Sequence, residues 1–344
     1  MIEKELARYL SSYDGPPLRL MEVCGTHTSF LYRTGIRQML SPKITLLSGP
    51  GCPVCVTPTA YIDKLVSYAM TDGYKVLAFG DLLSVPGSRM SLAGARDRGS
   101  HVDFLYNPED AFTLAEKDRN TTFILGAVGF ETTAPIWADM IRRCHEEKIP
   151  NIRFLTALKT MPEAMKILSG TGRIDGFLCP GHVAVITGAR PFRKLAEECG
   201  ETMVIGGFTA SLLLGALSRL VLEASKKKRG LWNEYPQVVR EEGNERAKTL
   251  LSEVFTSGDA VWRGIGTIPG SGLYISETYR DLDAGSHGLT EDRMPAGCRC
   301  GQVLTGAVTP EKCPCFGKAC TPDHPVGACM VSSEGTCSIT YRGG

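Results

Sequence analysis

Short apolar runs alternate with amphipathic segments from residue 18 to about residue 228. Each run ends in a turn rich in glycine or proline, and most of the segments that follow have apolar positions at helical spacing. Eight strands are predicted by these runs: Leu18–Val23, Ile44–Leu47, Lys75–Phe79, Val102–Tyr106, Thr122–Val128, Ile152–Leu155, Gly176–Leu178 and Thr202–Ile205. Alternating strands and helices indicate an α/β fold with mostly parallel strands.

The segments between the strands predict the helices Ala60–Thr71, Ala134–Lys148, Pro162–Ser169 and Pro191–Cys199. The charged stretch Asn107–Asn120 predicts a further helix and a boundary, because the strand pattern restarts after it. We therefore expect two similar parallel-sheet α/β domains around a cleft, at residues 1–120 and 121–230. A single eight-stranded barrel is the alternative.

The pattern changes after Thr209. Ala210–Leu222 predicts a buried helix, and Pro236–Phe255 predicts an amphipathic one. Regular periodicity is lost from about Trp262, and Ile268–Leu273 is interpreted as an irregular connection. We expect residues 231–344 to form a helical linker and a C-terminal cysteine-rich iron–sulfur domain.

Composition is that of an ordinary soluble globular protein, with 43% hydrophobic and 22% charged residues. The formal net charge of +1 gives no electrostatic case for binding nucleic acid or an anionic membrane. The charged N-terminal segment has no apolar core of a signal peptide, and no apolar run reaches the roughly 18 residues of a membrane span. We expect a cytoplasmic protein.

Cysteines are concentrated near the C-terminus, where seven of the 13 follow Gly297: Cys298, Cys300, Cys313, Cys315, Cys320, Cys329 and Cys337. Stable disulfides are rare in the cytosol and the total is odd, which favours a metal centre. The irregular spacing suits a [4Fe–4S] cluster held by Cys298, Cys313, Cys320 and Cys337, with a zinc site as the alternative. The spacing leaves open whether Cys298 or Cys300 is the ligand.

Chemically active residues follow the strand candidates, at the edge where parallel sheets carry their sites. These turns are Cys24-Gly-Thr-His27, Gly49-Pro-Gly-Cys52-Pro-Val-Cys55, Gly129-Phe-Glu131 and Cys179-Pro-Gly-His182. Because the carboxyl ends of parallel strands share one edge, we expect the turns to line a common cleft. Taken singly, Glu131 is typical of a helix cap and His182 of a core histidine.

Cys52 and Cys55 form a C-x-x-C pair at the start of a predicted helix. A helix N-terminus lowers the pKa of a thiol, and this spacing permits reversible disulfide formation. The alternative is half of a zinc site completed by Cys24 and His27. Cys24 and His27 either ligate one metal or pair as thiol and base.

Several strings now resemble the hydrogenase maturation factor HypD family over essentially the full chain. They are Glu22-Val-Cys-Gly-Thr-His27, Gly49-Pro-Gly-Cys-Pro-Val-Cys55, Phe79-Gly-Asp81 with Val85-Pro-Gly-Ser88, Gly129-Phe-Glu-Thr-Thr-Ala-Pro135, Cys179-Pro-Gly-His182, Trp262-Arg-Gly-Ile-Gly266, Cys298-Arg-Cys-Gly301, Ser332-Ser-Glu-Gly-Thr-Cys337 and Tyr341-Arg342.

The resemblance implies a scaffold and redox protein for assembly of the Fe(CN)₂CO unit of [NiFe]-hydrogenase, rather than a conventional turnover enzyme. It implies a HypC-like small chaperone and a HypE-like cyanide donor as partners. By motif, Cys24 would bind the iron with support from His27, and Cys52 and Cys55 would be the redox pair. Glu131 and His182 would line the cleft. The resemblance assigns the [4Fe–4S] cluster to Cys298, Cys313, Cys320 and Cys337.

The chain departs from the family pattern at Leu82–Ser84, Leu158, Thr209 and Cys315. These differences concern details of the cleft and of partner docking, and they leave open a divergent relative that serves another iron–cyanide assembly. Two other readings remain: a stand-alone iron–sulfur thiol–disulfide oxidoreductase, and a binding protein with a structural zinc site.

Overall fold

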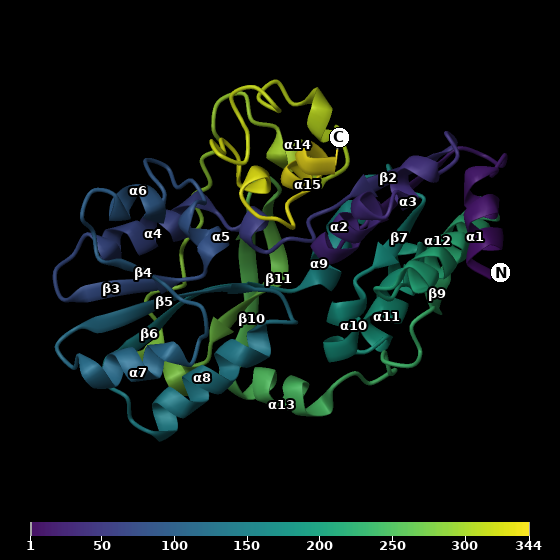
Figure 1. The fold of residues 1–344 in the computed structure, drawn as a ribbon. Helices are drawn as coiled ribbons and strands as arrows, with labels where there is room; N and C mark the ends of the chain where they lie inside the picture. The colour runs from purple at the N-terminus through teal and green to yellow at the C-terminus, as the bar shows by residue number, and fades with distance from the viewer. Residues whose placement is uncertain (1, 344) are drawn as a thin grey trace.

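The strands form two sheets in the computed structural model, which describes residues 2–343 (Figure 1). The first sheet has the order β2-β1-β7-β8-β9 and is parallel throughout. Its strands are β1 (Leu18–Glu22), β2 (Ile44–Ser48), β7 (Gly176–Cys179), β8 (Thr202–Ile205) and β9 (Gly230–Asn233).

The second sheet has the order β10-β11-β6-β5-β3-β4. Its strands are β3 (Tyr74–Ala78), β4 (Val102–Phe104), β5 (Thr122–Gly129), β6 (Ile152–Lys159), β10 (Phe255–Trp262) and β11 (Gly266–Ile275). Strands β3 to β6 are parallel, whereas β11 runs antiparallel to both β6 and β10. The α/β class and all eight predicted strands are confirmed, and the barrel alternative is wrong.

Sheet membership differs from the expected division into consecutive blocks at residue 120. Strands β1 and β2 pair with the late strands β7 to β9, while β3 to β6 build the other sheet. Leu20 of β1, for example, lies between Leu46 of β2 and Gly176 of β7. The chain therefore crosses between the sheets after β2 and returns after β6. Apolar periodicity identifies a strand but carries no information about its neighbours.

The helices cover both faces of each sheet. They are α1 (Ile2–Ser11), α2 (Gly25–Arg33), α3 (Ile36–Met39), α4 (Thr59–Ala69), α5 (Gly80–Leu83), α6 (Leu92–Arg96), α7 (Asp110–Lys117), α8 (Ala134–Glu146), α9 (Met161–Ser169), α10 (Gly181–Thr187), α11 (Arg190–Cys199), α12 (Ala210–Ser225), α13 (Glu245–Val254), α14 (Cys300–Leu304) and α15 (Thr336–Gly343). The short 3₁₀ helices are η1 (Val54–Val56), η2 (Glu277–Leu282), η3 (Pro310–Lys312) and η4 (Ala328–Met330). Within residues 2–343, no helix combines the length and apolarity that crossing a membrane requires.

Two expectations for the later part of the chain are wrong. The helix predicted from Pro236 begins only at Glu245, where the Asn244 side chain accepts a hydrogen bond from the amide of Ala247 and caps the first turn. The segment Ile268–Leu273, expected to be irregular, lies within β11. Its Pro-Gly sequence falls in a bulge opposite Asp259, whose carboxylate accepts a hydrogen bond from Gly270.

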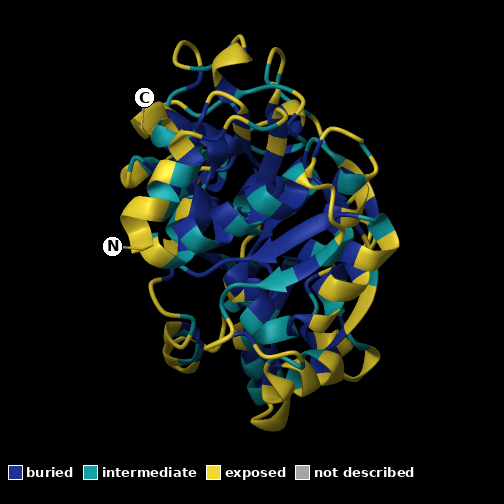
Figure 2. Ribbon diagram, turned by 90° about the vertical axis from the view of Figure 1, so that its right-hand side faces the viewer, coloured by how far each residue is buried: buried dark blue, intermediate teal, exposed yellow. Residues whose placement is uncertain are grey.

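Burial is greatest along the strands and on the inner faces of the helices, whereas exposed residues lie mainly on outer helix faces and loops (Figure 2). Helices α7 and α8 pack on one face of the second sheet, and α4 and α6 pack on the other. On the first sheet, α1 and α12 cover one face, and α9 to α11 cover the opposite one. Cysteines of the C-terminal segment belong to the same hydrophobic core as helices α9 to α11.

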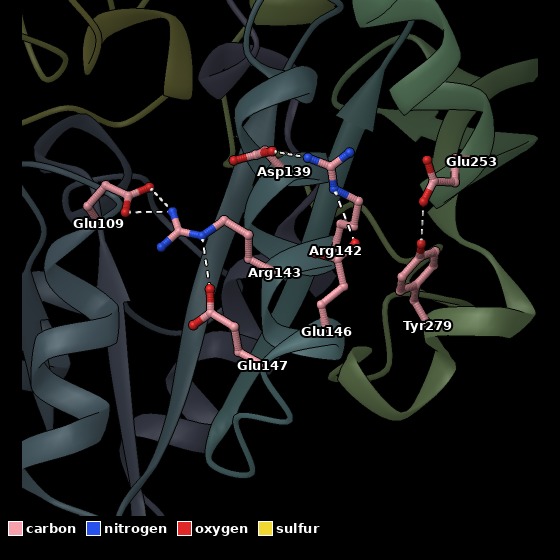
Figure 3. A network of polar contacts seen from close by, with 8 residues as sticks. All are labelled: Glu109, Asp139, Arg142, Arg143, Glu146, Glu147, Glu253 and Tyr279. Carbon is pink, nitrogen blue, oxygen red and sulfur yellow. Dashed lines mark hydrogen bonds and ion pairs between the residues drawn. The ribbon is translucent and has the colours of Figure 1, made fainter.

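The outer surface of α8 carries a network of polar contacts (Figure 3). Arg143 bonds the carboxylate of Glu109 at 2.7 and 2.8 Å and lies 3.5 Å from Glu147. Beside them, the Tyr279 hydroxyl donates to Glu253 at 2.7 Å and ties η2 to α13. Such exposed ion pairs contribute roughly 0–1 kcal/mol each, so the network orders this surface more than it stabilises the fold.

Residues 298–343, which we call the C-terminal module, form a cap at the top of Figure 1. Its helix α15 packs against α2, and η4 packs against η1. Gly301 of α14 contacts the backbone of Gly264, just after β10: a Cβ on Gly301 would lie 1.8 Å from the Gly264 carbonyl oxygen. The module is therefore seated directly on the ends of β1, β2 and β10.

We expect Gly301→Ala to loosen this seat, because backbone atoms cannot move aside as a flexible side chain does. The cost should be about 1–3 kcal/mol, the usual range for overpacking, read as a lower midpoint of thermal unfolding. Gly215→Ala is the matched control: it lies within α12 with no neighbouring atom within 4 Å of the added Cβ. The control should stabilise slightly, by about 0.4–1 kcal/mol. Equal midpoints for the two variants would contradict the seating contact.

Candidate functional site

Cys24 stands at the turn between β1 and α2, as its N-cap residue in an extended conformation. Its amide donates a 3.1 Å hydrogen bond to the carboxylate of Glu22, which also accepts a hydrogen bond from the Thr28 hydroxyl. Glu22 is fully buried, and burial raises the pKa of this carboxyl. The buried carboxyl thus fixes the backbone of the turn that presents the thiol.

Three segments distant in sequence meet at Cys24. A Cβ on Gly51 would lie 2.5 Å from the Cys24 nitrogen, and a Cβ on Gly25 would lie 2.5 Å from the Cβ of Glu334. The Thr26 hydroxyl also donates to the Glu334 carboxylate at 3.0 Å. Only 8% of Cys24 is exposed, and burial raises the pKa of its thiol to about 12. The thiol holds its proton at neutral pH unless a metal displaces it.

His27 is fully buried one helical turn further on. Its Nε2 lies 3.1 Å from the carbonyl oxygen of Gly207. A carbonyl can only accept, so Nε2 carries the proton and Nδ1 keeps a free lone pair. Nδ1 is buried without a hydrogen-bond partner in the described part of the chain. Burial lowers the pKa of His27 to about 3, so the imidazole is neutral and suited to bind a metal.

Phe208 joins the two histidines of the candidate site. Its ring stacks on His182 at 3.6 Å between centroids and on His27 at 4.5 Å. His182 is therefore linked to the Cys24 turn through an aromatic ring that our sequence reasoning did not select. The signal for Phe208 was present, since Gly207-Phe208 follows the eighth predicted strand.

Glu131 lies beside the start of α9 and bonds no residue of the Cys24 turn among the described contacts. It is 4% exposed, and its Oε1 accepts a 2.9 Å hydrogen bond from the amide of Met161 at the start of α9. Burial raises the pKa of this carboxyl to about 7. The hydrogen bond ties the end of β5 to α9, whereas the neighbouring Phe130 stacks on Trp262 at 5.6 Å.

Cys52 and Cys55 lie side by side, with their sulfur atoms 2.7 Å apart. The expected activation by a helix N-terminus is not found for Cys55. It lies in the three-residue helix η1, and burial raises the pKa of its thiol well above the ordinary value. Both residues are almost completely buried, at 3% and 0% exposure. The dithiol faces the protein interior rather than an open cleft.

Thiols of the C-terminal module lie next to the Cys52–Cys55 pair. The Cys55 thiol interacts with that of Cys329, which in turn interacts with Cys300 and Cys337. The sulfur atoms of Cys300 and Cys298 are 3.2 Å apart. The sequence left open whether Cys300 replaces Cys298 as a ligand, and it gave no role to Cys329. In the structure, Cys329 interacts with both Cys55 and Cys300 and so links the dithiol to this part of the module.

The surroundings of these sulfurs suit an inorganic cluster. The donors are all thiols, and a Cβ on Gly327 would lie only 2.5 and 2.6 Å from the sulfurs of Cys300 and Cys298. A glycine cradle over an all-thiol donor set fits an iron–sulfur centre. Among residues 2–343, no three His, Cys, Asp or Glu side chains are gathered tightly enough to hold a single metal ion. The choice between Cys298 and Cys300 as ligand, like the full ligand set, stays a prediction.

Comparison with known proteins identifies the family of the chain. The HypD family model, described as "Hydrogenase formation hypA family", matches residues 2–344. A putative hydrogenase expression/formation protein of Methanocaldococcus jannaschii is 37% identical over 329 residues, covering 94% of this chain and 92% of the relative. The hydrogenase maturation factor HypD of Rhodobacter capsulatus is 35% identical, covering 98% and 93%. That of Escherichia coli is also 35% identical, covering 98% and 92%. The chain belongs to the HypD family.

Proposed function

We propose that this protein acts in hydrogenase maturation as the scaffold on which the Fe(CN)₂CO unit of [NiFe]-hydrogenase is assembled. Its family membership and the names of its relatives support a role in hydrogenase maturation. The observation that carries the proposal is the meeting at Cys24 of the dithiol turn and the C-terminal module. The Cys24 thiol thereby lies next to the dithiol and the cysteine-rich module, which are the electron source in this proposal.

Iron is the cargo in this proposal, and Cys24 binds it together with a thiolate from a HypC-like chaperone. Low-spin iron with cyanide and carbonyl ligands favours soft thiolate donors. His27 supports the site through the free lone pair of Nδ1. A HypE-like protein supplies the cyanide. His182 orders the neighbouring wall through Phe208.

Cys52 and Cys55 form the redox pair that supplies electrons during ligand attachment. A [4Fe–4S] cluster held by Cys298, Cys313, Cys320 and Cys337 would supply those electrons one at a time. The interactions of Cys329 with Cys55 and Cys300 support this arrangement, since they connect the dithiol with the module. Because Cys52 and Cys55 are buried, they suit internal electron supply better than reaction with an external disulfide, which a stand-alone oxidoreductase would need.

Replacing the iron-binding thiol tests the scaffold directly. The Cys24→Ala variant, purified anaerobically with its chaperone, should lose the cyanide and carbonyl stretching bands from its infrared spectrum, because the iron loses a thiolate. Cys144→Ala is the control, since Cys144 is also buried but belongs to the core around α8. Its bands should remain. Full-strength bands in Cys24→Ala would overturn the assignment of the iron site.

The redox role requires a second test. With Cys52 and Cys55 both replaced by Ala, the infrared bands should fall at least tenfold while iron and acid-labile sulfide stay at wild-type levels, because only the electron supply is interrupted. Cys199→Ala serves as a thiol control outside the pair. Undiminished infrared bands in the double variant would contradict the redox role. Turnover of a small disulfide by the isolated protein would favour the oxidoreductase alternative. Zinc without sulfide would end the cluster assignment.

A further inference from the structure

Arg263 is a completely buried cation, located directly after β10. Its amide donates to the carbonyl oxygen of Val56 at 2.9 Å, one residue beyond the dithiol. Its Nη1 donates to the carbonyl oxygen of Pro86 at 2.8 Å. Nε and Nη2 are buried without any acceptor among the described residues. Two of the three guanidinium nitrogens thus lack a partner.

No carboxylate of residues 2–343 lies within ion-pair distance of this guanidinium. Asp292, whose carboxylate accepts from the amides of Gly264 at 2.7 Å and Thr59 at 3.4 Å, makes no ion pair with Arg263. Burying a charge is unfavourable unless it is paired and hydrogen-bonded. The guanidinium therefore keeps two buried donors free for an anion that no described carboxylate supplies in direct contact.

The thiols of the C-terminal module are in the right place to supply it. Gly264 contacts Gly301, the residue after Cys300. On its other side, the Arg263 amide bonds the carbonyl oxygen of Val56, the residue after Cys55. Arg263 therefore adjoins both the dithiol turn and the segment that carries Cys298 and Cys300.

We propose that Arg263 is a positioning residue that serves as the fixed counter-charge of the thiolate-bound cluster and favours its reduced form. This inference rests on the cluster of the proposed function. On reduction, the cluster accepts one electron from a low-potential donor, no bond forms or breaks, and the negative charge of the thiolate-bound unit grows by one. A buried guanidinium stabilises that added charge far more than a solvated cation does.

Removing the charge should make the cluster harder to reduce. We expect Arg263→Met to weaken electron uptake at least tenfold, which is a shift of about 59 mV to more negative potential for a one-electron couple. The measurement is a potentiometric titration of the intact protein with dithionite and mediators, followed by electron paramagnetic resonance. Arg299→Met is the matched control: it removes one positive charge between Cys298 and Cys300, but from an exposed residue. Its potential should stay close to that of the wild type.

Arg263→Lys separates charge from shape. A lysine variant that keeps its potential near the wild-type value supports the proposal, including where Arg263→Met loses the cluster altogether. An unchanged potential in a cluster-loaded Arg263→Met overturns it, as does an equal shift in Arg299→Met. Loss of the cluster from both Arg263 variants, in protein that folds normally, also overturns it.

Iron and sulfide analysis of the wild type distinguishes this proposal from the proposed function. A wild type without sulfide refutes the cluster itself, whereas a sulfide-loaded Arg263→Met at wild-type potential refutes the role of Arg263 alone.

Discussion

Backbone contacts between the C-terminal module and the strand-end turns determine the rest of the site. Gly25 lies against Glu334, Gly301 lies against Gly264, and a Cβ on Gly335 would lie 3.1 Å from the Cys55 sulfur. At each contact, the missing side chain allows one main chain to approach another segment directly. Thiols from both ends of the sequence are brought together without a linking secondary structure. The glycines among the cysteine motifs are therefore part of the site's architecture.

This close packing also sets the electrostatics. Burial raises the pKa of the Cys24 and Cys55 thiols and lowers the pKa of His27, so each of these groups is held in its neutral form. The Cys24 thiol therefore binds a metal only by giving up its proton, whereas neutral His27 already offers the lone pair of Nδ1. Arg263 is the exception, because a guanidinium keeps its charge when buried. This buried cation lies where the dithiol turn meets the module and favours negative charge there.

The strands and the cysteine-bearing turns could be predicted from the sequence, whereas the contacts between distant segments could not. The eight strands and the turns bearing Cys24 and Cys52 were predicted because apolar runs and glycine-rich turns are local features. The pairing of β1 with β7 was missed because parallel neighbours share no local signal. Strand β11 was hidden by its Pro-Gly bulge, and the contact of Cys329 with Cys55 by the distance between them in the sequence. The aromatic bridge through Phe208 depends on packing between three separate turns.

The contact between Thr26 and Glu334 joins residues 308 positions apart. Strand β1 likewise has its second edge paired only by β7, which lies far along the chain. Contacts between residues so distant in sequence carry a large loop-closure entropy, so they form late in folding. The thiol of Cys24 is therefore covered only when the fold is nearly complete.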